Sequence, residues 1–222
     1  MKLFLDTAKT DEIRHGLDMW DIDGVTTNPR HVMRSGMPFG QAMQEIAALF
    51  AGTDKPVSVE VNPHLADWEP IVEEARKLAA LSPNFVIKVS ASEAGFRAIR
   101  ELSQRGVRTN ATLIFSVTQA WHAARAGAAF ISPFIGWRET HGDPAADLVP
   151  EIRTMLDHYH YPSEIIAAAI RNGRQIADAA LAGAHCVTAG FAVYADSFRN
   201  PYTTMGEAVF QDAWDETPKA KD

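Results

Sequence analysis

The sequence predicts a single α/β domain, a (β/α)8 or TIM barrel with a C-terminal helical extension. Short apolar segments rich in β-branched residues alternate eight times with segments of helical periodicity, which is the pattern of a parallel barrel. The 222 residues suffice for one large α/β domain or two small ones, and no stretch has the composition of a linker. A doubly wound open sheet is the alternative, but such sheets usually contain fewer strands. We therefore expect one domain over residues 1–222, with residues 199–222 as a C-terminal helical arm.

The individual elements follow from local periodicity and from stop signals. The expected strands are residues 2–5, 24–29, 57–61, 84–90, 109–115, 129–134, 164–169 and 184–189. The expected helices are residues 10–20, 39–50, 67–81, 93–104, 117–126, 148–159 and 173–182. Gly106 and Gly127 stand where helices 93–104 and 117–126 should end. Residues 206–214 have the pattern of an amphipathic tail helix, for which packing on its own barrel is one expectation.

Composition excludes several classes of function. The formal charge of −7 argues against nucleic acid or an anionic membrane as the main partner, because both need a basic surface. The single cysteine, Cys186, lies in an apolar stretch, so we expect a small core residue and a reducing compartment. We find no signal peptide and no apolar run of membrane-spanning length, which predicts a soluble cytoplasmic protein. A spacing of two residues puts His158 and His160 on different faces of a helix, so no metal is expected there or elsewhere. No glycine-rich nucleotide loop or P-loop pattern is present either.

Lys88 is the one ionisable residue among the apolar residues of strand 84–90. A lysine is almost never fully buried without a partner, and burial favours the neutral, nucleophilic amine. The alternative is a lysine at a strand end whose amine reaches out to water. The other strands favour the first interpretation, because polar residues also lie at or near their carboxyl ends, where barrels carry their active sites. These residues are Asp6, Asn28, Glu60, Asn110, Thr112, Ser132, Arg171 and Thr188.

These residue types fit Schiff-base chemistry. An amine in an apolar pocket attacks a ketone, and the resulting iminium accepts electrons when a neighbouring carbon–carbon bond breaks. Asp6 and Glu60 are the candidate acid and base groups, and Thr112 is a candidate for positioning water. Asn28, Asn110 and Ser132 suit the hydroxyls of a sugar, because their side chains are neutral hydrogen-bonding groups. A sugar-binding barrel without catalysis, or one that uses the lysine structurally, is the alternative of another class.

The segments FLDT, GVTTNP, SVEV, NFVIKV, TNATLIFS and ISPFIG together resemble the transaldolases, in the compact branch that includes the fructose 6-phosphate aldolases. The resemblance implies a class I mechanism without metal or organic cofactor, and a homo-oligomer in which terminal helices pack on neighbouring subunits. By position it implies Lys88 as the Schiff-base lysine, Asp6 as the general acid and base, and Glu60 with Thr112 as the pair that activates water. The implied ligands of the dihydroxyacetone portion are Asn28, Asn110 and Ser132, and the same motifs place Thr27 and Phe134 in the substrate site. Aldolase members tend to carry glutamine at the position of Glu60, so the glutamate favours a transaldolase.

The departures from this family lie at the anion end of the expected substrate. Family members that bind sugar phosphates have an arginine directly after the SPFxG segment, where this chain has Trp137 followed by Arg138. They also have a Ser-Phe-Arg run after the seventh strand, where this chain has Ala169, Ile170 and Arg171. Arg30, after GVTTNP, is followed by His31 and replaces the usual small residue. A pocket with fewer positive charges suits a singly charged anion better than a phosphate.

The combination of TTNPRH, SPFIGWRE, AAAIRNG and GFAVYADSF resembles the sulfofructose transaldolases. This resemblance implies transfer of dihydroxyacetone from 6-deoxy-6-sulfofructose to an aldehyde such as glyceraldehyde 3-phosphate, with release of sulfolactaldehyde. The expected partners are therefore small sulfosugar or sugar-phosphate substrates. The alternative function is transaldolase or aldolase activity on ordinary sugar phosphates. For the two residues the alternatives are structural: Trp137 would be a hydrophobic plug in a loop, and Arg138 would be a solvent-exposed charge in that loop. Which of Arg30, Arg138 and Arg171 contacts the anion is left open.

Overall fold

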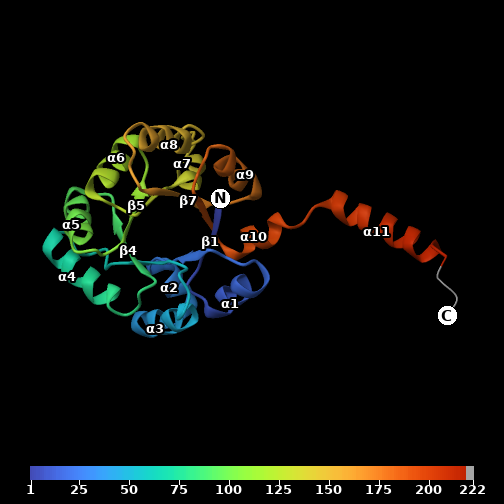
Figure 1. Cartoon of the computed structure of the whole chain (residues 1–222), viewed down its shortest axis with the longest axis horizontal. Helices are drawn as coiled ribbons and strands as arrows, with labels where there is room; N and C mark the ends of the chain where they lie inside the picture. Colours follow the sequence, from blue (N-terminus) through green and yellow to red (C-terminus); the bar gives the residue numbers. More distant parts are fainter. Residues whose placement is uncertain (219–222) are drawn as a thin grey trace.

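The computed structural model describes residues 1–218 and confirms the predicted barrel. Its parallel strands pair in sequence order, and β8 pairs with β1 to close the sheet. Figure 1 shows the helices as an outer ring around the strands. The strands are β1 (Lys2–Asp6), β2 (Gly24–Thr26), β3 (Val57–Glu60), β4 (Phe85–Ser90), β5 (Thr109–Ile114), β6 (Phe130–Pro133), β7 (Glu164–Ile170) and β8 (Cys186–Ala189).

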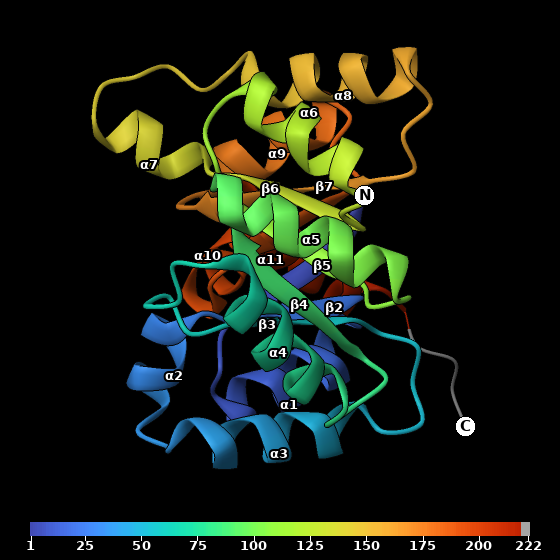
Figure 2. The ribbon, with the colours of Figure 1, turned by 90° about the vertical axis from the view of Figure 1, so that its left-hand side faces the viewer.

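The helices of residues 1–218 include all those expected and three that were not. The expected ones are α1 (Thr10–Met19), α3 (Phe39–Phe50), α4 (Trp68–Ala79), α5 (Glu93–Gln104), α6 (Val117–Ala126), α8 (Leu148–His158), α9 (Gly173–Leu181) and α11 (Pro201–Glu216). The additional ones are α2 (Pro29–Ser35), α7 (Ile135–Thr140) and α10 (Phe191–Ser197), which follow β2, β6 and β8. Figure 2 shows α2 and α7 on the same side of the barrel, away from the N-terminus. The three extra helices therefore lie at the carboxyl ends of the strands.

The expected strand over residues 24–29 was too long, because β2 ends at Thr26. Asn28 instead caps α2, since its side-chain oxygen accepts a hydrogen bond from the backbone N–H of His31 at 3.0 Å. Pro29 occupies the first helical position, where its missing N–H costs nothing. The chain consequently turns sharply at the end of β2, and α2 is held over the mouth of the barrel.

The barrel interior has an apolar base and a polar upper layer. Phe4, Val86, Phe130, Ile166 and Cys186 form the buried apolar cluster, which confirms Cys186 as a core residue. Its burial raises the pKa of the thiol. Two residues further along β1, β4, β6 and β8 the inward side chains are polar, namely Asp6, Lys88, Ser132 and Thr188, whereas β7 has Ala168. In register, Glu60 pairs with Lys88 and Lys88 with Asn110. Alternation along parallel strands thus stacks a polar layer on an apolar one.

Of the two arrangements considered for the tail helix, packing on its own barrel is wrong. Helix α11 is longer than residues 206–214, and none of its residues, which all lie in the described part of the chain, is buried. Figure 1 shows it extending away from the barrel. Tyr202, Phe210 and Trp214 are 78%, 76% and 71% exposed. The expected arm of residues 199–222 thus includes α11, while residues 219–222 lie outside the described part.

Within residues 1–218, no helix has both the length and the apolar character needed to cross a membrane.

Candidate active site

A cavity of about 500 Å³ opens at the carboxyl ends of the barrel strands. Every strand contributes a residue to its lining: Asp6, Thr26, Glu60, Lys88, Thr112, Ser132, Ala168 and Thr188. The cavity is also lined by Asn28, Arg30, Phe134, Trp137 and Arg171. The structure therefore brings together most of the residues that the sequence singled out.

Lys88 lies on the floor of this cavity. Its side chain is 5% exposed, which rules out an amine that reaches out to bulk water. The Nζ atom donates a hydrogen bond to the carbonyl of Thr27 at 3.2 Å and lies 3.5 Å from Oε2 of Glu60. The register of β3 and β4 places the two residues side by side. A proton can thus pass between the amine and a carboxylate without a large movement.

Glu60 and Asp6 have pKa values shifted in opposite directions. Burial raises the pKa of Glu60, an effect that Lys88 opposes and the charge of Asp6 reinforces. Burial would also raise the pKa of Asp6, but the hydrogen bond and charge of His31, the charge of Lys88 and the hydroxyl of Thr26 outweigh it, so the pKa lies below its usual value. Glu60 is thereby suited to hold a proton and Asp6 to accept one.

Hydrogen bonds hold Asp6 through both of its oxygens. Oδ1 accepts the Thr26 hydroxyl at 2.7 Å, and that hydroxyl lies 2.7 Å from the hydroxyl of Thr188. Oδ2 lies 3.0 Å from Nε2 of His31 on α2. Sequence reasoning noted His31 only as a departure from the family pattern. Recognising Asn28-Pro29 as the start of a helix would have placed His31 in its first turn, above the end of β1.

Four of the expected site residues differ in whether their side chains already have hydrogen-bond partners within the protein. Thr112 Oγ1 is buried and has no hydrogen-bond partner among residues 1–218, so it can hold a water or a substrate group. Ser132 lines the cavity, while its hydroxyl donates to Asn110 Oδ1 at 2.8 Å. Asn110 lies behind the cavity wall, where its Nδ2 donates to Ser58 Oγ at 3.0 Å. Thr27 is similarly buried, with its hydroxyl donated to the Ser58 carbonyl at 2.8 Å.

Trp137 lies in the cavity wall on α7, so it is not a hydrophobic plug in a loop. Its ring packs edge-on against Phe134 with centroids 5.4 Å apart. Close packing of α7 against the end of β7 fixes this position, because a Cβ atom at Gly136 would lie 2.2 Å from the carbonyl oxygen of Ala169 and 2.9 Å from Cγ of Arg171. Trp137 and Arg171 therefore share one side of the cavity.

The arginines divide into two groups. Arg30, Arg34 and Arg171 line the cavity. Arg138 instead forms a bidentate pair with Asp143, at 2.6 and 2.8 Å, which directs its guanidinium away from the site. Arg34 was not expected as a site residue, because only the helical spacing from Arg30, revealed by α2, brings it to the same face.

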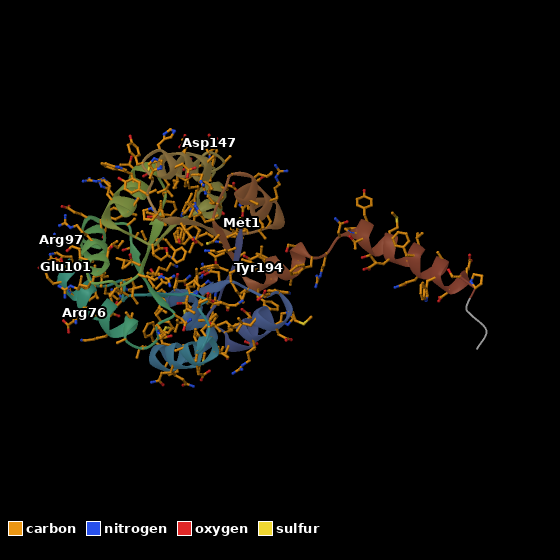
Figure 3. The ribbon with its side chains drawn as sticks, viewed as in Figure 1. Met1, Arg76, Arg97, Glu101, Asp147 and Tyr194 are labelled. Carbon is orange, nitrogen blue, oxygen red and sulfur yellow. The ribbon has the colours of Figure 1, made fainter. Side chains whose placement is uncertain are left out.

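Figure 3 labels Tyr194 where α10 meets the barrel. Its hydroxyl donates to the carbonyls of Phe4 and Val187, at 2.9 and 3.1 Å, and the ring is buried. Burial raises its pKa, and the nearby charge of Asp6 adds to this effect. Tyr194 thus ties α10 to the first and last strands beside the site.

Comparison with known proteins agrees with this geometry. The "6-deoxy-6-sulfo-D-fructose transaldolase" of Priestia aryabhattai is 50% identical over 218 residues, which cover 98% of this chain and 96% of the relative. The protein of the same description from Priestia megaterium has the same identity and coverage. A "Probable transaldolase" of Lachnoclostridium phytofermentans is 41% identical over 95% of this chain and 96% of its own length. The model of the family "Transaldolase/Fructose-6-phosphate aldolase" matches residues 3–221. The predicted family is confirmed: this chain belongs to the transaldolase/fructose-6-phosphate aldolase family.

Proposed function

We propose that the protein is a class I transaldolase that moves a dihydroxyacetone unit from 6-deoxy-6-sulfofructose to an aldehyde acceptor such as glyceraldehyde 3-phosphate, releasing sulfolactaldehyde. The chemistry is carried by one observation, the buried Lys88 amine 3.5 Å from the Glu60 carboxylate in a cavity lined by all eight strands. The sulfosugar is supported by the two Priestia relatives, which are 50% identical to this chain.

Imine formation uses Lys88, Glu60 and Thr112. A proton passes from the lysine ammonium to Glu60, whose raised pKa favours the protonated form. The neutral amine then adds to C2 of the ketose, and the carbinolamine hydroxyl takes the Glu60 proton and leaves as water. The product is a protonated imine at Lys88 and an ionised Glu60. Thr112 holds the water that later reverses this step, because its buried hydroxyl has no partner among residues 1–218.

Carbon–carbon cleavage uses Asp6. Its carboxylate takes the proton of the C4 hydroxyl, the C3–C4 bond breaks, and the electron pair moves into the iminium to form an enamine on Lys88. The C4 fragment leaves as an aldehyde. The enamine C3 then attacks the carbonyl carbon of the acceptor, and the proton on Asp6 passes to the new alkoxide. The lowered pKa of Asp6 provides the ionised base at the start of this sequence.

Arg30, Arg34, Arg171 and Trp137 line the cavity, and we assign the anion end of the ketose to these residues. A sulfonate carries one charge and a phosphate monoester nearly two. Arg138 is occupied by Asp143, so we assign anion binding to Arg171, with Arg30 and Arg34 approaching from α2. Comparing kcat/KM for 6-deoxy-6-sulfofructose and fructose 6-phosphate, with glyceraldehyde 3-phosphate as acceptor, tests the proposed sulfosugar substrate. A strong preference for the phosphate would overturn it in favour of an ordinary sugar-phosphate transaldolase.

Two further measurements distinguish a transaldolase from an aldolase and from a barrel without catalysis. A fructose 6-phosphate aldolase would release free dihydroxyacetone in the absence of any acceptor. A non-catalytic sugar-binding barrel would gain no covalent adduct when incubated with ketose and borohydride.

We also propose that the protein forms a homo-oligomer through α11. Five large apolar side chains of this helix are exposed: Tyr202, Met205, Val209, Phe210 and Trp214. A cluster of exposed apolar residues on a helix outside the barrel is typical of a protein–protein contact.

A further inference from the structure

The side chain of His31 lies where the mechanism above needs a partner but assigns none. Its Nε2 is 3.0 Å from Oδ2 of Asp6, and the two side chains are only 18% and 21% exposed. The other oxygen of Asp6 accepts the Thr26 hydroxyl at 2.7 Å. Both carboxylate oxygens are therefore engaged, and rotation of the carboxylate is restricted from two sides.

The fold places His31 independently of Asp6. Its backbone N–H closes the Asn28 cap at the start of α2, which fixes the first turn of that helix. Its neighbour Val32 is buried in the hydrophobic core and anchors the same turn. His31 thus reaches the Asp6 carboxylate from a rigid element that does not belong to the barrel wall.

We propose that His31 is a positioning residue for carbon–carbon cleavage, which holds the Asp6 carboxylate oriented and ionised so that it can take the substrate hydroxyl proton. This inference rests on the role of Asp6 in the proposed function. Since Oδ1 is bonded to Thr26 and Oδ2 to His31, each oxygen keeps a lone pair for the substrate. His31 therefore acts through Asp6 and not on the reacting atoms.

The charged groups around this pair come from several elements. Lys88 on β4 favours the ionised form of Asp6, as His31 does, whereas burial opposes it. The charge of Asp6 contributes to raising the pKa values of Glu60 on β3 and Tyr194 on α10. Arg30 and Arg34 on α2 and Arg171 after β7 line the same cavity. Without His31, the effect of burial on the pKa of Asp6 is opposed mainly by the charge of Lys88. The pKa of Asp6 should therefore rise, which favours the protonated acid.

The test compares His31→Gln and His31→Phe with the unaltered enzyme. Glutamine can still donate a hydrogen bond to Asp6 but cannot carry charge, and phenylalanine does neither. The matched control is His64→Gln, because His64 is an exposed histidine in the segment after β3. Two quantities are measured for each protein: kcat/KM for ketose cleavage from acidic to alkaline pH, and the borohydride-trapped adduct of dihydroxyacetone on Lys88.

We expect the acidic limb of the pH profile to move to higher pH in His31→Phe, with a loss of roughly ten- to a hundredfold at acidic pH, the range for losing a hydrogen bond to a charged group. The loss should shrink at alkaline pH, where Asp6 ionises unaided. His31→Gln should fall between, and His64→Gln should match the unaltered enzyme. Trapping on Lys88 should be retained in all of them, because imine formation uses Glu60 and Thr112.

An equal loss at every pH, or loss of the trapped adduct, would show that His31 only supports the fold and would overturn the inference. An acidic limb that stays in place or moves to lower pH would do the same. Asp6→Asn separates the role of His31 from that of Asp6. If that variant is inactive while His31→Phe keeps the unaltered profile, only the role of His31 fails. If Asp6→Asn is fully active, the cleavage role of Asp6 fails and the inference fails with it.

Discussion

Under the proposed function, Trp137→Arg should shift the substrate preference from sulfonate toward phosphate. The indole lies on α7 in the wall of the cavity, on the same side as Arg171, and is 41% exposed. An arginine side chain is long enough to present its guanidinium to the cavity from this position. It would add a second cation beside Arg171, and the gain is larger for a ligand with nearly two charges than for a ligand with one.

The size of the effect follows from the interactions gained and lost. Hydrogen bonds to charged groups contribute about 1.5–3 kcal/mol each, and about 1.4 kcal/mol corresponds to a factor of ten. The ratio of kcat/KM for fructose 6-phosphate to that for 6-deoxy-6-sulfofructose should therefore rise roughly ten- to a hundredfold. The lost contact with Phe134, whose ring centroid is 5.4 Å away, should lower the free energy of unfolding by about 1 kcal/mol, the range of an aromatic pair.

The assay is steady-state turnover of both ketoses with glyceraldehyde 3-phosphate as acceptor. Trp137→Leu serves as the matched control, because it removes the indole without adding a charge. The leucine variant should leave the ratio nearly unchanged while losing activity on both substrates. If Trp137→Arg alters both substrates equally, the indole does not face the anion and the argument from charge is wrong.

Three other changes test separate parts of the site. Lys88→Met should abolish both turnover and the borohydride adduct, because no other amine lines the cavity in residues 1–218; an adduct detected by mass spectrometry in this variant would refute the assignment of the nucleophile. Arg171→Leu should raise KM for the anionic ketose by roughly ten- to a hundredfold, and KM for fructose far less. Arg138→Leu should change neither KM, because the Arg138 side chain is already paired with Asp143. Equal effects of the two substitutions in steady-state kinetics would argue against anion binding by Arg171. Phe210→Asp should reduce the mass measured by light scattering from that of an oligomer to that of a single chain, because a charge would enter an apolar contact; an unaltered protein that is already monomeric would exclude an assembly through α11.

The barrel was predictable because every strand carries its own signal. In β4, Phe85 to Val89 are apolar apart from Lys88, and a run of this kind indicates a strand covered on both faces. Helix α5 was predicted with the correct bounds because its apolar positions recur over twelve residues and Gly106 follows its end. Helices long enough for their period to repeat were all predicted, although α11 begins before and ends after the expected residues 206–214.

Helices α2, α7 and α10 were missed for the opposite reason. They have only seven, six and seven residues, so fewer than two full turns are available to show a period of 3.6. Their omission hid His31 and Arg34, whose placement over the cavity depends on the face that α2 presents. Two backbone features were also beyond sequence reasoning. Leu113 and Ala169 have positive φ values of 59° and 58° beside irregularities in register at β5–β6 and β7–β8, in a region that non-glycine residues rarely adopt.

The two carboxylates show how one barrel mouth produces both an acid and a base. Asp6 and Glu60 project into the same cavity, and Lys88 lowers the pKa of each. What distinguishes them is the second set of contacts: Asp6 also has the Thr26 hydroxyl and His31, whereas the charge of Asp6 itself acts on Glu60 and raises its pKa. The charge of Asp6 thus favours the protonated form of Glu60. The proposed mechanism requires this division, because in it Glu60 releases a proton during imine formation before Asp6 accepts one during cleavage. In the proposed mechanism His31 therefore acts on the cleavage step, through the carboxylate of Asp6.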